Sequence, residues 1–92
     1  MVVVVGSEKG GTGKTTIATN LAIYRAQANR DVLLIDADPQ GSAIEFSRVR
    51  ESEGHSPQVT CVMVTGRSVA SEVRKLAPRF GDVVIDVGGR DS

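Results

Sequence analysis

The stretch VVVVGSEKGGTGKTT, residues 2–16, decides the fold, because it joins a β-branched run to a glycine-rich loop and then to the start of a helix. Four valines ending at Gly6 are typical of a strand buried on both faces of a parallel sheet, where apolar and polar residues no longer alternate. Three glycines follow between residues 10 and 13, and they let backbone N–H groups crowd around an anion. The order predicts a phosphate-binding loop between a first strand and a first helix.

The side chains of this loop have the chemistry that a bound nucleoside triphosphate requires. Lys14 is expected to neutralise β- and γ-phosphate oxygens, and the Thr15 hydroxyl to ligate a Mg²⁺ ion that bridges them. Thr16 is expected to donate to an α-phosphate oxygen. The loop residues expected to contact nucleotide are Gly10, Gly11, Thr12, Gly13, Lys14, Thr15 and Thr16. The alternative, a glycine-rich turn that only caps a helix, has far less weight given the strand, loop and helix setting.

Strand-like and helix-like segments alternate along the rest of the chain. Apolar, β-branched runs predict strands at 2–5, 31–36, 59–64 and 82–86. Helical spacing predicts helices over 14–29, around 44–49 and over 69–77, the last of them ended by Pro78. Residues 51–58 are expected to form a surface loop. The alternation predicts an α/β fold with a parallel sheet flanked by helices.

Carboxylates follow two of the later strands, and ligands of an open parallel sheet bind beyond the carboxyl ends of its strands. Asp36 and Asp38, in DADPQG (36–41), are two apart and therefore on one side of an extended chain. Near a Mg²⁺-nucleotide they would hold metal-bound waters and orient the attacking water. An Asp-Pro turn with a solvated carboxylate is an equally weighted alternative. Asp86 ends the last strand and matches a second metal-holding position, so the expected metal residues are Thr15, Asp36 and Asp86.

Length and composition narrow the class of protein. The 92 residues fit one domain over 1–92, and eleven Lys and Arg balance eleven Asp and Glu, so charge alone supports neither a nucleic-acid nor a membrane surface. The apolar run of residues 2–5 is too short for a membrane span or a signal-peptide core. The single cysteine, Cys61, excludes an internal disulfide and favours a reducing, cytoplasmic setting.

These segments together resemble the ParA/MinD family of deviant Walker ATPases, whose phosphate loop has the form KGGxGK[ST] with an additional lysine in front. That lysine is Lys9 here, and the family pattern does not demand glycine at the position of Glu8. The resemblance implies a P-loop NTPase (Rossmann-like) fold, ATP/ADP and Mg²⁺ as ligands, and a nucleotide-sandwich homodimer in which Lys9 reaches the phosphates of the other subunit. It implies catalytic roles for Lys9, Lys14 and Asp38, with Asp38 positioning the attacking water and Asp36 supporting Mg²⁺.

The DADPQG segment is similar to that of ParA-type partition ATPases. This similarity implies ATP hydrolysis and nucleotide-dependent dimerisation that drives DNA segregation or cargo positioning. It also implies a ParB-like centromere-binding activator and non-specific DNA as partners, a cytoplasmic, nucleoid-associated location and no membrane. A MinD-like membrane-associated positioning ATPase and a non-catalytic nucleotide-binding fragment are the alternatives.

Family members are considerably longer than 92 residues. Residues 1–92 are therefore expected to be an incomplete four-strand N-terminal portion, truncated at its C-terminus. The first strand would then be a sheet edge, which predicts either a truncated sample or an association that covers the edge.

Overall fold

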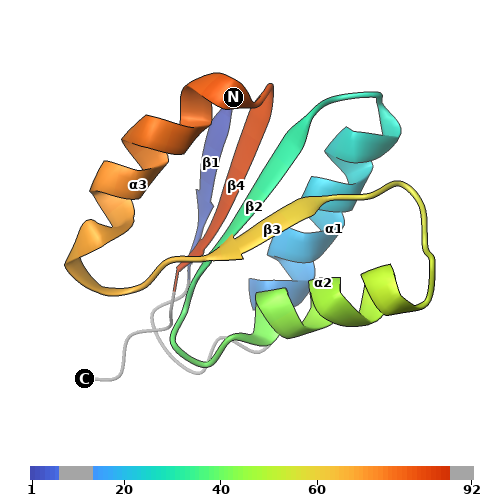
Figure 1. Ribbon diagram of the computed structural model, residues 1–92, viewed down its shortest axis with the longest axis horizontal. Coiled ribbons are helices and arrows are strands. Elements are labelled where there is room, and N and C mark those ends of the chain that lie inside the picture. The colour runs from blue at the N-terminus through green and yellow to red at the C-terminus, as the bar shows by residue number, and fades with distance from the viewer. Residues whose placement is uncertain (7–13, 88–92) are drawn as a thin grey trace.

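A computed structural model describes residues 1–6 and 14–87, with the backbone alone for residues 14 and 15, and shows a sheet with helices on both faces (Figure 1). The helices and strands, with two short 3₁₀ turns (η), follow the chain in the order β1 (Val2–Val5), α1 (Lys14–Gln27), β2 (Val32–Ala37), α2 (Ser42–Ser52), β3 (Thr60–Met63), η1 (Gly66–Ser68), α3 (Val69–Leu76), η2 (Ala77–Arg79) and β4 (Asp82–Val87). The predicted α/β fold is confirmed.

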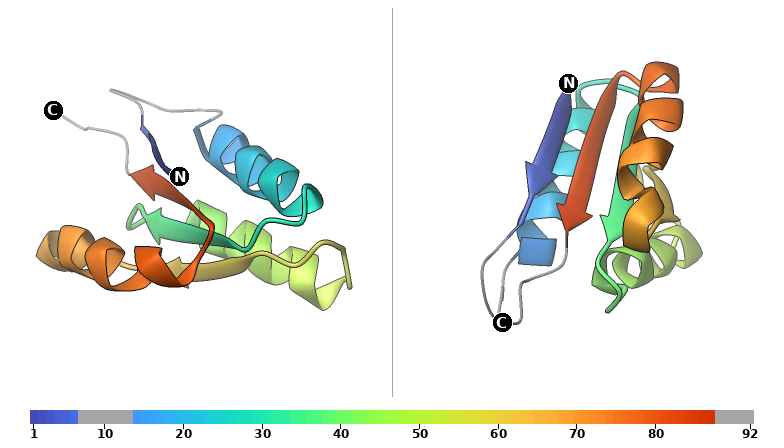
Figure 2. Two further views of the ribbon diagram at one scale, coloured as in Figure 1. Left: turned by 90° about the horizontal axis from the view of Figure 1, so that it is seen from above. Right: turned by 90° about the vertical axis from the view of Figure 1, so that its left-hand side faces the viewer.

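The described sheet has four parallel strands in the order β1-β4-β2-β3. Figure 2 shows the arrowheads of β1, β4 and β2 pointing the same way, so their carboxyl ends share one edge of the sheet. Element boundaries differ from the predicted ones by a few residues. The first helix ends at Gln27 rather than near 29, where Asn29 takes a left-handed conformation (φ 63°), and α2 runs to Ser52, so the following loop begins later than predicted.

Two hydrophobic clusters fill the two sides of the sheet. Figure 2 shows the helices that cover these sides. On one side, α1 and α2 pack against Leu34 and Val84 of the central strands. Three alanines of α1 are buried there, and their spacing of four residues places them on one helix face, where small side chains let the helix approach the sheet closely: Ala18, Ala22 and Ala26. This close approach holds α1 against the central strands of the sheet.

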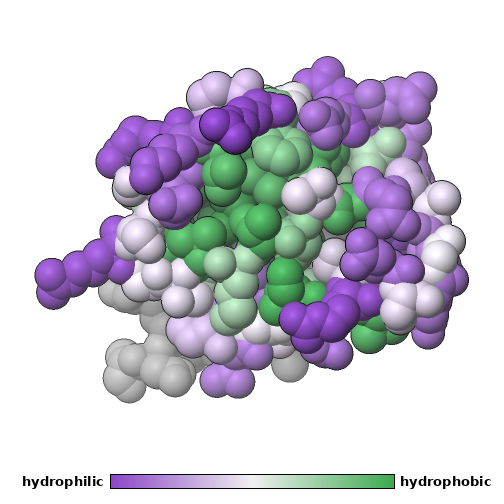
Figure 3. All heavy atoms as spheres, viewed as in Figure 1, coloured by the Kyte–Doolittle hydropathy of each residue, from purple (hydrophilic) through white to green (hydrophobic). Residues whose placement is uncertain are grey.

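The other face of the sheet has α3 as its main cover. Val73 and Leu76 of α3 pack against a cluster formed by Leu33, Ile35, Val83 and Ile85. Figure 3 shows that apolar side chains stay visible on this face beside the helix. The helix gives way to η2 at Ala77, directly before Pro78, as predicted from the bias of a residue preceding proline.

The first strand differs from its prediction of burial on both faces. Within the described residues β1 pairs with β4 alone, and Val2 and Val4 keep 52% and 61% of their surface exposed. That prediction is wrong because β1 has no second neighbour in the described sheet and α3 leaves Val2 and Val4 exposed. The predicted sheet edge is confirmed for this part of the chain. Association over the edge stays a prediction.

At the end of the sheet where the strands begin, one buried carboxylate holds three cationic groups. Asp82 accepts a hydrogen bond from Arg25 Nε at 2.9 Å and two from Arg30, from Nε and Nη2, each at 3.0 Å. The N-terminal ammonium of Met1 lies 3.5 Å from Asp82 Oδ1 and donates to the Gly81 carbonyl at 3.1 Å. These contacts join the start of β1, the end of α1 and the start of β4, and they hold the pKa of Asp82 well below its usual range.

Replacing Asp82 with asparagine should lower Tm at pH 7 on the order of 10 °C, because the arginines lose their buried counter-charge. The depressed pKa means that the unfolded chain binds more protons in acid. The stabilisation is therefore full above about pH 4 and is lost as pH falls from there toward the folded pKa. Thermal unfolding from pH 7 down to pH 2, with Asp31→Asn as a control at a nearby exposed aspartate, measures this. A Tm difference that does not shrink in acid would contradict it.

Candidate functional site

Two buried aspartates lie side by side at the carboxyl edge of the sheet. Asp36 of β2 is in register with Asp86 of β4, which is in turn in register with Val5 of β1. Neighbouring strands are about 4.8 Å apart, so the two aspartates are adjacent across the ladder. Neither carboxylate is accessible to solvent. Side chains alternate along a strand, so both lie on the face that carries Leu34 and Val84, with α1 and α2. The sheet thus brings together two of the three expected metal residues.

The start of α1 lies at the same edge. Arg25, in the last turn of α1, contacts Asp82 where β4 begins, so the first turn must lie toward the opposite, carboxyl end of the strands. A helix of 14 residues spans about 21 Å, which covers the length of the six-residue strands. The end of β1 and the start of α1 therefore lie at the same edge of the sheet as Asp36 and Asp86.

Gly6 permits a close approach where the chain leaves β1. A Cβ atom added there would lie 2.6 Å from Cγ2 of Val87, the last residue of β4, so a side chain at this position would force the two strand ends apart. Gly6 therefore keeps the exit of β1 close to Asp86.

Several predicted site residues lie outside what the structure describes. These are Lys9, Gly10, Gly11, Thr12 and Gly13, together with the side chains of Lys14 and Thr15. Their roles stay predictions. Thr16 is described, is exposed in the first turn of α1, and its carbonyl accepts a hydrogen bond from the Thr19 hydroxyl at 3.2 Å.

The DADPQG segment forms an ordered turn built around its two carboxylates. Asp36 Oδ1 accepts the Asp38 N–H at 3.1 Å, and Asp36 Oδ2 accepts the Ile44 N–H at 2.8 Å. Asp38 is half-buried, its Oδ1 accepts the Gln40 N–H at 2.9 Å, and its carbonyl accepts the Gly41 N–H at 2.9 Å. The turn agrees with the alternative weighed from the sequence, and of its two carboxylates Asp36 is fully buried whereas Asp38, which precedes Pro39, is half-buried.

The donor set suits Mg²⁺ only as part of a larger site. Carboxylate and hydroxyl oxygens are the protein ligands that Mg²⁺ takes, usually one or two of them with waters and phosphate oxygens. Across residues 1–6 and 14–87, no group of three or more His, Cys, Asp or Glu side chains is placed to hold a metal ion. Two adjacent aspartates at a nucleotide's phosphates fit this partial ligation, and each oxygen of Asp36 has a second lone pair beyond its bond to an amide.

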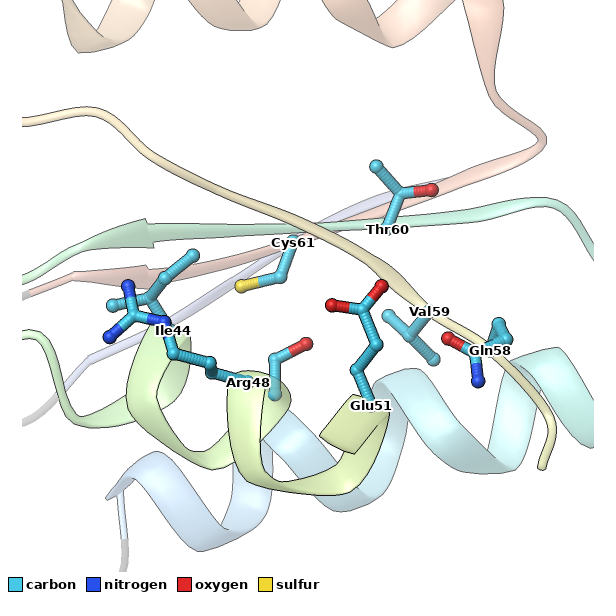
Figure 4. Close-up of a pocket in the computed structure, with 8 residues that line it drawn as sticks. Ile44, Arg48, Glu51, Gln58, Val59, Thr60 and Cys61 are labelled. Carbon is cyan, nitrogen blue, oxygen red and sulfur yellow. The ribbon is translucent and has the colours of Figure 1, made fainter. Parts of the chain in front are cut away.

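A separate cleft of about 310 Å³ runs between α2 and β3 (Figure 4). In Figure 4 the Glu51 side chain reaches from α2 toward the strand that carries Cys61. Cys61 is in register with Leu34, two residues before Asp36, so the cleft lies beside the edge strand β3 and away from the carboxyl ends of the strands. Burial, with a smaller contribution from the charge of Asp36, raises the pKa of the Cys61 thiol to about 12. The thiol therefore stays protonated at neutral pH and is a poor nucleophile.

The hydrogen bond that links Asp36 to α2 was not predicted from the sequence. The residue before the helix is Gly41, in a left-handed conformation (φ 72°), and it provides no side-chain cap. The first N–H groups of a helix need acceptors, and Asp36 supplies one from β2 to the Ile44 N–H. A glycine at the position before a helix, where Ser, Thr, Asp or Asn is usual, is the signal that could have prompted a search for a distant acceptor.

Comparison with protein families places this geometry in a known group. A family model described as the CobQ/CobB/MinD/ParA nucleotide binding domain matches residues 3–91. The chain belongs to this family. The match includes the β1–α1 connection, the DADPQG turn and Asp86, so the predicted relation to ParA and MinD proteins is confirmed.

Relatives of known cellular role match the first half of the chain. The chromosome-partitioning ATPase Soj of Thermus thermophilus is 48% identical over 52 residues, 56% of this chain and 21% of that protein. The chromosome partitioning protein ParA of Myxococcus xanthus is 52% identical over 42 residues, 46% of this chain and 15% of that protein. Maintenance of carboxysome distribution protein A of Gloeobacter kilaueensis is 64% identical over 42 residues, 46% of this chain and 19% of that protein. The chain thus spans about a fifth or less of their length.

Solved structures of nucleotide-binding proteins share the fold. The signal recognition particle 54 kDa protein of Aeropyrum pernix, in complex with GDP, superposes with a TM-score of 0.65 at 26% identity over 99% of this chain and 22% of that one. FlhF, complexed with GMPPNP and Mg²⁺, gives a TM-score of 0.64 at 22% identity over 98% of this chain and 34% of that one. The chain therefore has the P-loop NTPase fold. Among its described helices, none is long and apolar enough to cross a membrane.

Proposed function

We propose that residues 1–92 form a nucleotide-binding domain that takes ATP and Mg²⁺ and hydrolyses ATP to ADP and phosphate, as part of a ParA-type partition ATPase. One observation carries the proposal: the in-register pair Asp36 and Asp86 lies at the carboxyl edge of the sheet, where β1 ends and α1 begins. That edge is where ligands of open α/β sheets bind. The similarity to Soj and ParA supports the partition role.

The proposed chemistry assigns each group one task. Lys14 holds the β- and γ-phosphates, Lys9 from a second subunit adds charge at the γ-phosphate, and Asp38 orients the water that attacks it. Thr15 and Asp86 are the groups that we propose hold Mg²⁺ or its waters. Bound Mg²⁺ neutralises charge on the phosphate oxygens. Burial of Asp86 supports this role, because a fixed carboxylate in a dry site needs no reorganisation during the reaction.

The proposed cellular cycle follows from this chemistry. ATP brings two copies together, the dimer binds DNA non-specifically at the nucleoid, and a ParB-like activator stimulates hydrolysis and releases it. A cargo-positioning role is the second candidate, favoured by the identity to the carboxysome distribution protein. A ParB-like protein raising turnover only in the presence of DNA would separate the first role from the second.

Nucleotide binding is the first test. The chain has three lysines, so Lys14→Ala can be compared with Lys75→Ala on the exposed side of α3. Removing the phosphate-holding charge is expected to weaken ATP binding by roughly 30-fold or more, whereas Lys75→Ala leaves it unchanged. Titration with ATP and Mg²⁺, followed by a phosphate-release assay, measures both steps. Binding without turnover at saturating ATP would favour a non-catalytic nucleotide-binding domain, and no binding would reject the proposal.

A further inference from the structure

Asp36 makes hydrogen bonds to several segments around the candidate site. Its two carboxylate oxygens each accept a backbone N–H, one from Asp38 and one from Ile44. Its own carbonyl accepts the Val64 N–H, just after β3, at 3.0 Å. One fully buried residue therefore binds β2, the turn that carries Asp38, the first turn of α2 and the end of β3.

These bonds are of the strong kind. A carboxylate that accepts backbone amides forms charge-assisted hydrogen bonds, about twice as strong as neutral ones. The bond to Ile44 also places a negative charge at the amino end of the 11-residue helix α2, where the helix dipole favours it. Gly41 supplies no cap there, so the start of α2 depends on Asp36.

We propose that Asp36 is a positioning residue: it fixes the turn so that the Asp38 carboxylate is held where the attacking water must be oriented. This inference rests on the proposed function, because it concerns the reaction assigned to Asp38. The path from one aspartate to the other is a single hydrogen bond of 3.1 Å to the Asp38 backbone. The turn is closed further by the bonds from Gln40 and Gly41 to Asp38, so the carboxylate has few ways to move once the Asp38 backbone is fixed.

This role differs from the predicted one, in which Asp36 supports Mg²⁺. A metal-supporting carboxylate acts on ground-state binding of the Mg²⁺-nucleotide. A positioning residue acts on the geometry of the later step, in which water attacks the phosphate. Its loss does not change the gain in ATP affinity that Mg²⁺ provides. The two roles therefore predict opposite results for the same variant, Asp36→Asn, which keeps the size of the side chain and one oxygen acceptor but turns an N–H toward the second amide.

The first test uses the nucleotide-free protein and no activity assay. Amide hydrogen exchange of the wild-type chain should show the Asp38 and Ile44 N–H groups protected by roughly 10²-fold or more over an open loop. In Asp36→Asn, the protection of the Asp38 amide, the Ile44 amide or both should fall, whereas the protection of the core amide of Val84 should not change. Wild-type amides that exchange at the rate of an open loop would overturn the proposal even if the variant failed to fold.

The second test separates positioning from metal binding. For Asp36→Asn we expect kcat to fall on the order of a hundredfold, with KM for ATP and the ratio of ATP affinity with Mg²⁺ to that with EDTA within about twofold of wild type. Asp31→Asn, at the other end of the same strand, should change neither. Loss of the Mg²⁺-dependent affinity, or an unchanged kcat, would overturn the positioning role. A wild-type chain that binds no nucleotide would instead reject the proposed function, while the exchange experiment still decides whether Asp36 holds the turn.

Discussion

Lys9→Ala is expected to lower the rate of ATP hydrolysis by roughly 10³-fold, while ATP binding through Lys14 falls far less. The reason is the resemblance to the deviant Walker loop, in which the front lysine acts on the phosphates of the other subunit, as an arginine finger does in trans. Such a charge acts as the transferring phosphoryl group becomes more negative, so it changes kcat more than ground-state binding. Phosphate release and ATP titration, with Lys75→Ala as the matched control, measure the two quantities. Turnover within about threefold of wild type would contradict the prediction.

A mixing experiment tests whether Lys9 acts across the interface. Lys9→Ala and Asp38→Asn are each expected to be inactive alone. In a mixed dimer, the subunit that keeps Asp38 receives Lys9 from the other subunit, so one of its two sites is complete. Random pairing of equal amounts should therefore restore about a quarter of the wild-type rate. If Lys9 acted within its own subunit, neither site would be complete and the mixture would stay inactive.

Much of the candidate site could be predicted because its parts are local in sequence. A β-branched run, a glycine-rich loop and a helix lie within the first 29 residues, and each aspartate closes its own apolar run. Parallel strands end at one edge of a sheet, so it followed that Asp36 and Asp86 would be near each other, and the register confirms it.

The rest depends on contacts between distant residues, which no local pattern encodes. Asp82 binds arginines 57 and 52 positions earlier in the chain, so its buried cluster was not predicted. The exposure of Val2 and Val4 depends on how many neighbours β1 has, whereas the valine run indicates only that a strand forms. The bond from Asp36 to the start of α2 spans eight residues across a turn, beyond the two or three of an ordinary cap.

Asp38→Asn is the second large effect: we expect turnover to fall by about 10² to 10⁴-fold, with ATP binding and ATP-dependent dimerisation kept. The structure gives a reason why this variant should keep the fold of the turn. Asp38 takes part in its turn through an oxygen that accepts the Gln40 N–H and through its backbone, and the asparagine oxygen accepts the same bond. The substitution removes the negative charge that we propose orients and polarises the attacking water.

The comparison of Asp38→Asn with Asp36→Asn then distinguishes the residue proposed to act on the attacking water from the residue proposed to position it. Both variants should slow turnover, but Asp36→Asn should release the Asp38 and Ile44 amides and Asp38→Asn should not, because Asp36 accepts the hydrogen bonds of both amides. Asp38→Asn should also accumulate as an ATP-bound dimer, and its solution mass should double on addition of Mg²⁺-ATP. The doubled mass of the variant should persist, whereas that of the wild type should fall again as ATP is consumed. If Asp38→Asn kept its turnover, the attacking water would have to be oriented by another group. The positioning role of Asp36 would then be contradicted too, because that role is to hold the Asp38 carboxylate in place.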